Sequence, residues 1–177
     1  MTQRVAVFEK VTEKQYLEGF EKCRAGLMRC LTGKEPDPKA LWESIRLPRR
    51  ATSGSAGYDF FTPAEFTLSA GESLLLPTGI RAKITDGWFL ACFPRSGLGF
   101  KYRLQLDNTV GIIDSDYYFT PNEGHIFVRM TNDSREGKQL TVAAQNAFMQ
   151  GIFLPYGLTM DDSTETVREG GLGSTDR

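Results

Sequence analysis

Near its start the chain has a stretch in which hydrophobic residues recur at the spacing of an amphipathic helix. This stretch, residues 12–33, opens with Thr12 and Gln15, which fit a helix capping box. Glutamate and lysine fill the opposite face, so the pattern predicts a helix packed on the main body or on a neighbouring subunit, with a dedicated partner-binding helix as the alternative. The apolar positions are Leu17, Phe20, Leu27, Met28 and Leu31.

Pro36 and Pro38 are expected to end this helix, because proline lacks the amide hydrogen that a helix interior needs. A linker is expected to follow, with a few apolar residues that could anchor it to the body. These anchors are Leu41, Trp42, Ile45 and Leu47.

From residue 51 the pattern changes to short β-rich runs separated by Gly, Pro, Asn and Asp. Many short strands at this spacing favour a sandwich, a jelly roll or a closed barrel. After Tyr156 the chain turns polar and carries too little apolar surface to order itself. The predicted strands are Tyr58–Thr62, Ser73–Leu76, Ile80–Ile84, Trp88–Phe93, Gln105–Ile113, Ile126–Met130, Gln139–Val142 and Phe148–Leu154.

The composition excludes several classes of function. With 177 residues and 40% hydrophobic content, the chain fits one globular domain. A net charge of -1 gives no basic field of the kind that nucleic-acid binders use, so no nucleic acid is expected as the main ligand. We find no membrane-length apolar run and no signal-peptide pattern in MTQRVAVFEK, so a cytoplasmic protein is expected.

The cysteine and histidine content limits the chemistry further. Cys23, Cys30 and Cys92 are expected to be reduced thiols, since the two that share a helix lie about 10 Å apart, beyond disulfide reach. The single histidine, His125, cannot build a His-rich metal site by itself. Any metal is therefore expected to be held by oxygen ligands.

Two glycine-containing segments carry candidate phosphate chemistry. In PRSGLGF, Gly97 and Gly99 permit a turn with converging amides, while Arg95 and Ser96 supply further donors, which together make a plausible anion site. In ATSGSAGYDF a tight glycine path leads to Asp59 at the start of a strand, where a simple turn with a solvated carboxylate is the equal alternative.

The segment DNTVGIIDSDY carries a second kind of chemistry. Asn108 offers both a donor and an acceptor to a base edge, and Gly111 permits close backbone approach to a ligand. Asp114 follows two isoleucines, which favours a partly desolvated general base; Asp116 could be a surface acid. Tyr117 could be a core aromatic or a flat wall for a sugar ring.

These motifs together resemble those of a known family, the homotrimeric dUTP pyrophosphatases (dUTPases). They occur in the order and approximate spacing of that family's five motifs, over about residues 51–175. The matching segments are ATSGSAGYDF, PTGI (77–80), PRSGLGFK, NTVGIIDSDY, the run from Gln150 to Pro155, and GGLGST (170–175).

The resemblance implies an all-β, jelly-roll-like β-barrel, with three subunits that form three sites at their interfaces. It implies hydrolysis of dUTP to dUMP and pyrophosphate, which lowers dUTP and supplies dUMP for thymidylate synthesis. Asp114 matches the carboxylate that activates the attacking water. Mg²⁺ would be bound mainly by the triphosphate, with Asp59 acting through a water molecule.

The resemblance also implies a set of substrate contacts. Phosphate contacts would come from Arg95, Ser96, Gly97 and Gln150. The uracil contacts match Asn108, Gly111, Ile112 and Ile113, and the deoxyribose contact matches Tyr117. In the arm that closes over the nucleotide, the matching residues are Leu172, Gly173, Ser174 and Thr175.

By this resemblance the chain divides into an N-terminal helical extension and linker (1–45), a barrel core (46–156) and a flexible C-terminal arm (157–177). Several positions depart from the family pattern: Leu172 replaces the usual aromatic, Arg168 lies one residue closer to the glycine-rich run, and 118–124 is a small insertion beside the sugar pocket. Gln145-Asn146-Ala147 stands where Gly-Glu-Arg is common. These departures bear on affinity and selectivity.

Two other functions compete with hydrolysis of dUTP. A dCTP deaminase shares the fold, but it needs a glutamate on the strand that here reads HIFVRM (125–130). A dUTP-binding regulatory interaction protein, with a protein partner on the N-terminal extension, is favoured by residues 1–45, the insertion and the altered arm.

Overall fold

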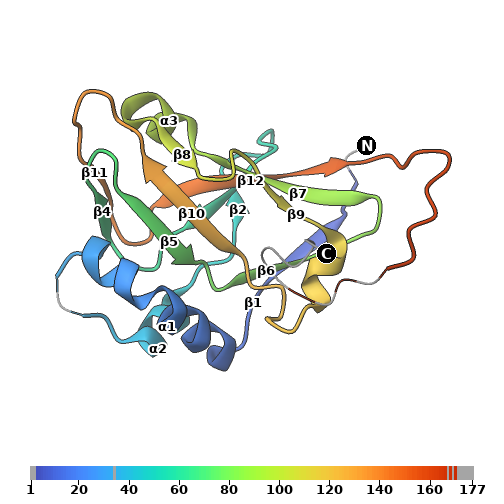
Figure 1. The fold of residues 1–177 in the computed structure, drawn as a ribbon, viewed down its shortest axis with the longest axis horizontal. Coiled ribbons are helices and arrows are strands. Elements are labelled where there is room, and N and C mark those ends of the chain that lie inside the picture. Colours follow the sequence, from blue (N-terminus) through green and yellow to red (C-terminus); the bar gives the residue numbers. More distant parts are fainter. Residues whose placement is uncertain (1–2, 34, 167, 169, 171–177) are drawn as a thin grey trace.

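The computed structural model describes residues 3–33, 35–166, 168 and 170. Its regular structure is mostly β, which confirms the all-β prediction (Figure 1). The strands are β1 (Ala6–Lys10), β2 (Arg49–Arg50), β3 (Tyr58–Phe61), β4 (Phe66–Leu68), β5 (Ser73–Pro77), β6 (Ile80–Ile84), β7 (Trp88–Pro94), β8 (Leu104–Leu106), β9 (Gly111–Ile113), β10 (Phe127–Asn132), β11 (Leu140–Val142) and β12 (Ala147–Pro155). The helices are α1 (Glu13–Cys30), α2 (Pro38–Ser44), α3 (Ser96–Tyr102) and the short 3₁₀ helix η1 (Ser115–Phe119).

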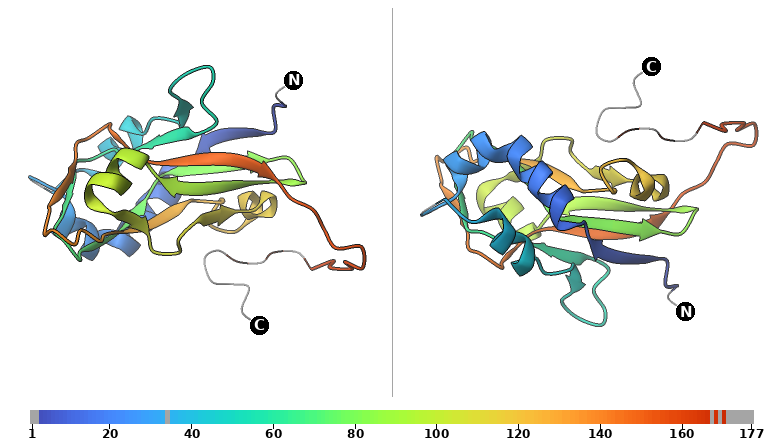
Figure 2. Two further views of the ribbon diagram at one scale, coloured as in Figure 1. Left: turned by 90° about the horizontal axis from the view of Figure 1, so that it is seen from above. Right: turned by 90° about the horizontal axis from the view of Figure 1, so that it is seen from below.

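All strand pairs are antiparallel, and β12 lies at the centre of the largest sheet. That sheet has the order β2-β3-β12-β7-β9, and smaller groups are formed by β5-β10-β8, β1-β6 and β4-β11. The helices α1 and α2 lie at the opposite end of the molecule from the segment that follows β12 (Figures 1 and 2).

The strands alternate buried and outward-facing residues, as a sheet with one face on the core requires. In β6, for example, Ile80, Ala82 and Ile84 are buried, whereas Arg81 and Lys83 point outward. The same alternation in β10 buries its apolar residues and exposes Arg129. One continuous apolar core results, to which α1 contributes as well as the strands.

The helix predicted over residues 12–33 is confirmed as α1. Thr12 is its N-cap, and the Thr12 hydroxyl accepts a hydrogen bond from the Gln15 amide at 3.2 Å. The helix packs against β5 and β4 with its apolar face inward, so that Phe20 and Leu27 are in the core. Because this face is buried within the chain, it is not free to bind a protein partner.

The segment expected to be a linker contains a second helix. Pro38 begins α2 instead of preventing it, because a proline at the first helical position loses no hydrogen bond and is already in helical geometry. Asp37 caps this helix by accepting from the Lys39 amide at 3.0 Å. Trp42 fastens α2 to the body, where its indole Nε1 donates to the Val11 carbonyl at 2.9 Å.

Three strands were not predicted, and one predicted strand is divided. The missing strands are β1, β2 and β4. β1 and β4 pair with strands distant in sequence, and β2 has only two residues, so the local pattern gives little signal for any of them. The predicted strand Gln105–Ile113 is interrupted by a turn in which the Thr109 amide donates to the Leu106 carbonyl at 2.8 Å. The structure therefore has β8 and β9 where the sequence predicts one strand.

Since α1 is part of the core, we expect Phe20→Ala to destabilise the protein. Phe20 is 1% exposed, and truncation of a buried phenylalanine costs about 3–5 kcal/mol of the free energy of unfolding. Chemical denaturation would measure this loss. The control is Lys14→Ala on the exposed face of the same helix, for which a change within about 0.5 kcal/mol is expected. Equal small effects at both positions would contradict the packing of α1 in the core.

Candidate active site

The five-stranded sheet brings together the residues predicted to contact phosphate. In its register Gln150 of β12 lies opposite Asp59 of β3 on one side and Phe93 of β7 on the other. Arg95 follows the end of β7, and its Nε lies 3.2 Å from the Asp59 Oδ1. The side chain of Asp59 is 17% exposed, so this ion pair is partly screened from water. The Gln150 Nε2 donates to the Pro94 carbonyl at 3.4 Å.

The turn predicted for PRSGLGF is wrong: these residues form the short helix α3. Arg95 is its N-cap, and Gly97 and Gly99 have ordinary helical backbone with no positive φ. The amides of Leu98 and Gly99 both donate to the Arg95 carbonyl, at 3.1 and 2.9 Å, which closes the first turn. Ser96 and Gly97 are exposed at its start.

The residues predicted to contact a base lie on β9 and the turn before it, next to β7. Gly111 pairs with Cys92, and a Cβ at Gly111 would lie 3.2 Å from the Cys92 Cβ and 3.8 Å from the Asn108 Nδ2. The absence of a side chain at Gly111 therefore lets the two strands and Asn108 approach closely. Ile113 is half-buried, whereas Ile112 is 52% exposed. Burial raises the pKa of the Cys92 thiol to about 12, so Cys92 is not a nucleophile.

Asp114 follows β9 and leads into η1. The Asp114 side chain is 48% exposed, so it is about half covered by the residues around it. Arg168 lies beside it, with its Nη2 2.6 Å from the Asp114 Oδ2 and its Nε 2.9 Å from the Asp116 Oδ1. The guanidinium also lies 5.8 Å from the centre of the Tyr117 ring. The sequence indicated Asp116 only as a surface acid, but both carboxylates bind Arg168.

Tyr117 is buried, and its hydroxyl is held by the residues that follow it. The hydroxyl donates to the His125 carbonyl at 2.9 Å and accepts from the Asn122 Nδ2 at 3.0 Å. Thr120 closes the turn by donating to the Tyr117 carbonyl at 2.7 Å. The ring orientation is therefore fixed by the insertion 118–124.

The two halves of the candidate site lie on neighbouring strands of one sheet. Phosphate-side residues come from β3, β12 and the end of β7, and base-side residues come from β9, which pairs with β7. Within the residues that the structure describes, no group of three or more His, Cys, Asp and Glu side chains could hold a metal ion. The expected arm residues Leu172, Gly173, Ser174 and Thr175 lie outside the described residues.

Comparison with known proteins identifies the family. The sequence model of the dUTPase family matches residues 43–175, which is most of the chain. The chain belongs to the dUTPase family. The prediction of a dUTP diphosphatase is thereby confirmed, and the matched residues include every predicted site residue.

Individual relatives agree with this assignment. The deoxyuridine 5'-triphosphate nucleotidohydrolase of Lactococcus lactis is 38% identical over 134 residues, which cover 74% of this chain and 88% of the relative. That of Pectobacterium carotovorum is 35% identical over 159 residues, covering 85% and 99%. The crystal structure of the Streptococcus mutans dUTPase, 38% identical, matches 73% of this chain and 95% of its own with a TM-score of 0.57.

A dUTPase from phage phi11 of Staphylococcus aureus shares the fold at 20% identity, with a TM-score of 0.57 over 72% of this chain and 94% of its own. The jelly-roll-like prediction is consistent with these structures. In the part of the chain that the structure describes, no helix is long and apolar enough to cross a membrane.

The carbonyl that accepts the Tyr117 hydrogen bond belongs to His125, a buried histidine. Its protonation makes the free energy of unfolding depend on pH. The His125 Nε2 accepts from the Gly79 amide at 2.9 Å, so the ring proton is on Nδ1, which has no hydrogen-bond partner among the described residues. Burial lowers the pKa of His125 to about 4, an effect that nearby Lys22 reinforces and Glu123 opposes.

We therefore expect the protein to lose stability as the pH falls below about 6.5, the pKa of an unfolded histidine. The unfolded chain takes up the proton first, so the contribution of His125 to the free energy of unfolding should fall by about 2 kcal/mol from pH 7 to pH 5 and level off near pH 4. Denaturant unfolding at one protein concentration would measure this. His125 is the only histidine, so His125→Gln should abolish the slope between pH 7 and pH 5; an unchanged slope would contradict the assignment.

Proposed function

We propose that this chain hydrolyses dUTP to dUMP and pyrophosphate, with Asp114 as the base that activates the attacking water. Membership of the dUTPase family supports the substrate and the reaction. The observation that carries the proposal is the strand register, in which β12 and β7 bring Asp59, Gln150 and Arg95 into one sheet with β9. The same register sets Asp114 beyond Ile113, at the Trp88 end of β7, and Arg95 at the opposite end of that strand. The phosphate-side residues of one subunit would therefore combine with the base-side residues of a neighbouring subunit to form one site.

In this proposal the base end of the substrate lies along β9. The backbone of Gly111, Ile112 and Ile113, together with the Asn108 amide, would form hydrogen bonds with uracil. Cytosine presents the opposite donors and acceptors at the same edge, so it would leave buried polar groups unpaired. Tyr117 would face the deoxyribose, where its fixed ring leaves no room for a 2'-hydroxyl.

The phosphate end would lie against Arg95, Ser96, Gly97 and Gln150. Arg95 and the exposed first turn of α3 offer donors to phosphate oxygens. Asp59 fits Mg²⁺ as a single oxygen ligand acting through water, since this ion keeps several waters and binds substrate phosphates. When bound, Mg²⁺ would neutralise charge on the departing pyrophosphate. Leu172, Gly173, Ser174 and Thr175 are proposed to close over the nucleotide and exclude water.

Asp114 would accept a proton from the water that attacks the α-phosphorus. In the free chain the Arg168 Nη2 lies 2.6 Å from the Asp114 Oδ2, so one oxygen of the proposed base is engaged in an ion pair before substrate binds. A triphosphate offers Arg168 a more strongly anionic partner than two exposed carboxylates. Substrate binding would therefore release the base and attract the arginine in the same step.

We also propose that the protein acts as a homotrimer with its sites at subunit interfaces. The segment after β12 supports a role in assembly, because it extends from the body (Figure 1). It also exposes apolar side chains. These are Tyr156, Leu158 and Met160. In the cell the reaction would lower dUTP and supply dUMP for thymidylate synthesis.

We expect Asp114→Asn to abolish hydrolysis while dUTP still binds, because the amide cannot accept the proton. A general base contributes about 10²–10⁴-fold, so kcat should fall at least a hundredfold. Phosphorus NMR of the protein with dUTP and Mg²⁺ would identify dUMP and pyrophosphate, with dCTP as the control substrate. Asp133→Asn should leave turnover unchanged. It removes a carboxylate that binds Arg103 at the ends of β10 and β8, outside the five-stranded sheet. Hydrolysis by Asp114→Asn within a few-fold of the unaltered rate would contradict the role of Asp114.

A further inference from the structure

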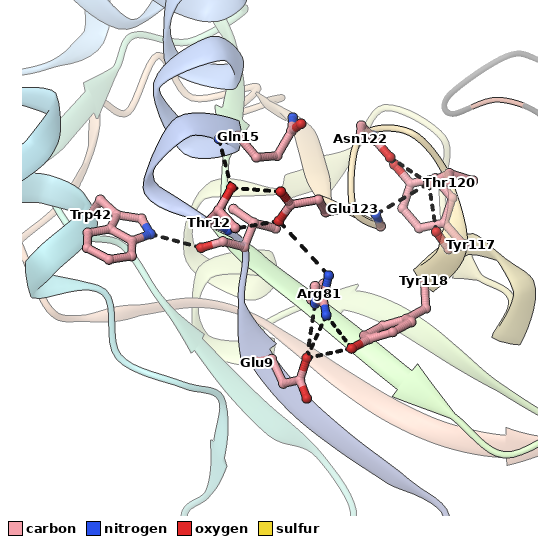
Figure 3. Close-up of polar contacts among 12 residues, drawn as sticks. Glu9, Thr12, Gln15, Trp42, Arg81, Tyr117, Tyr118, Thr120, Asn122 and Glu123 are labelled. Atoms are coloured by element: carbon pink, nitrogen blue, oxygen red, sulfur yellow. Dashed lines mark hydrogen bonds and ion pairs between the residues drawn. The ribbon is translucent and has the colours of Figure 1, made fainter.

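Two parts of the chain that differ from the family pattern meet beside Tyr117. These are the N-terminal segment, residues 1–45, and the insertion 118–124. The Glu123 carboxylate accepts from the Thr12 amide at 2.8 Å and from the Thr12 hydroxyl at 2.7 Å (Figure 3). The sequence assigned the second half of this capping box to Gln15, but Glu123, which is 111 residues from Thr12, provides it.

A second contact joins the same two segments. The Tyr118 hydroxyl donates to the Glu9 Oε2 at 2.7 Å, and the Arg81 Nε donates to the same oxygen at 3.0 Å (Figure 3). Arg81 also stacks on Tyr118, with its guanidinium carbon 4.0 Å from the ring centre. Arg81 lies on β6 directly across from Glu9 on β1, so the strand register sets this contact.

Charge stabilises both contacts. The Tyr118 hydroxyl, with help from Arg81, holds the pKa of Glu9 below its usual value although burial opposes this. Burial also acts to raise the pKa of Glu123, but the Thr12 amide and hydroxyl and the nearby Arg81 outweigh it and lower the pKa. Both glutamates are therefore ionised at neutral pH, when their hydrogen bonds are strongest.

The backbone at Glu123 indicates that its position is enforced. Glu123 has a φ of 58°, in the left-handed region that is unfavourable for a residue with a side chain. The two hydrogen bonds to Thr12 offset this cost. Only short connections separate Glu123 from the Tyr117 ring: the neighbouring Asn122 donates to the Tyr117 hydroxyl, and the Asn122 Oδ1 lies 2.6 Å from the Thr120 hydroxyl oxygen.

We propose that Glu123 is a positioning residue, through which the N-terminal segment holds Tyr117 in place and so sets the discrimination between deoxyribonucleotide and ribonucleotide. The inference rests on the proposed function, in which Tyr117 faces the sugar. Thr12 is the residue of the N-terminal segment that holds Glu123, through its amide and its hydroxyl. Loss of either partner would leave the insertion joined to the N-terminal segment mainly through Tyr118, and the Tyr117 ring could then yield to a 2'-hydroxyl.

The test compares dUTP with UTP in Glu123→Gln, Thr12→Val and the double variant. Steady-state kinetics and calorimetric affinities with Mg²⁺ would both be measured, the affinities in an Asp114→Asn background. We expect the UTP-to-dUTP ratio of kcat/KM to rise about tenfold. For dUTP, the decrease in kcat/KM should come mainly from a higher KM, because a less rigid Tyr117 holds the substrate less tightly. The effects of the two single variants should not add in full in the double variant, since Thr12 and Glu123 contact each other directly.

Two controls separate positioning from simple loss of stability. Thr12→Ser keeps the hydroxyl and should retain discrimination. Glu136→Gln changes an exposed carboxylate whose ion pair is with Lys138, so it should leave the UTP-to-dUTP ratio unchanged. Lower melting temperatures with an unchanged UTP-to-dUTP ratio, or additive effects in the double variant, would overturn the positioning role. If the unaltered chain failed to hydrolyse dUTP, the proposed reaction would be wrong, but the affinity ratio would still test the role of Glu123.

Discussion

The position of β12 between β3 and β7 is the constraint on which the rest of the site depends. Side chains alternate faces along a strand, so a slip of one residue in β12 would turn Gln150 away from the face it now occupies and expose the buried Met149. Burial on this strand therefore fixes its register. Gly151 contributes to this, because a Cβ there would lie 2.7 Å from the Leu90 Cδ1 and 3.1 Å from the Phe60 ring.

The strand register, and not an unusual environment of any one side chain, determines which residues of the proposed site lie close together. Asp114 is exposed and paired with Arg168, Arg95 is paired with Asp59, and Cys92 is an inert buried thiol. Each acidic group of the proposed mechanism thus has an arginine beside it in the free chain. Binding of a triphosphate would exchange these ion pairs for contacts with phosphate and metal. The ion pairs of the free chain would thus hold these side chains near the positions that they occupy when the nucleotide is bound.

The sequence predicted those features that are encoded locally or in a family motif. The 3.6-residue spacing of Phe20 and Leu27 was sufficient for α1, and the alternation in Ile80–Ile84 was sufficient for β6. The helix α3 was missed because Gly97 and Gly99 argue for a turn, although the Arg95 carbonyl closes a helical turn there. Glu123 could not be predicted as the partner of Thr12, because that contact depends on tertiary folding over 111 residues.

The central claim is that the segment after β7 and the neighbouring strand β9 both take part in binding the nucleotide. Amide hydrogen exchange, measured with and without a non-hydrolysable imido analogue of dUTP and Mg²⁺, tests this most directly because it reports on each strand separately. The account predicts that the analogue slows exchange in 94–102 and in 108–117 together, with the outer strands β4 and β11 unaffected. Protection of only one of these two segments, or protection confined to residues far from β7 and β9, would contradict it.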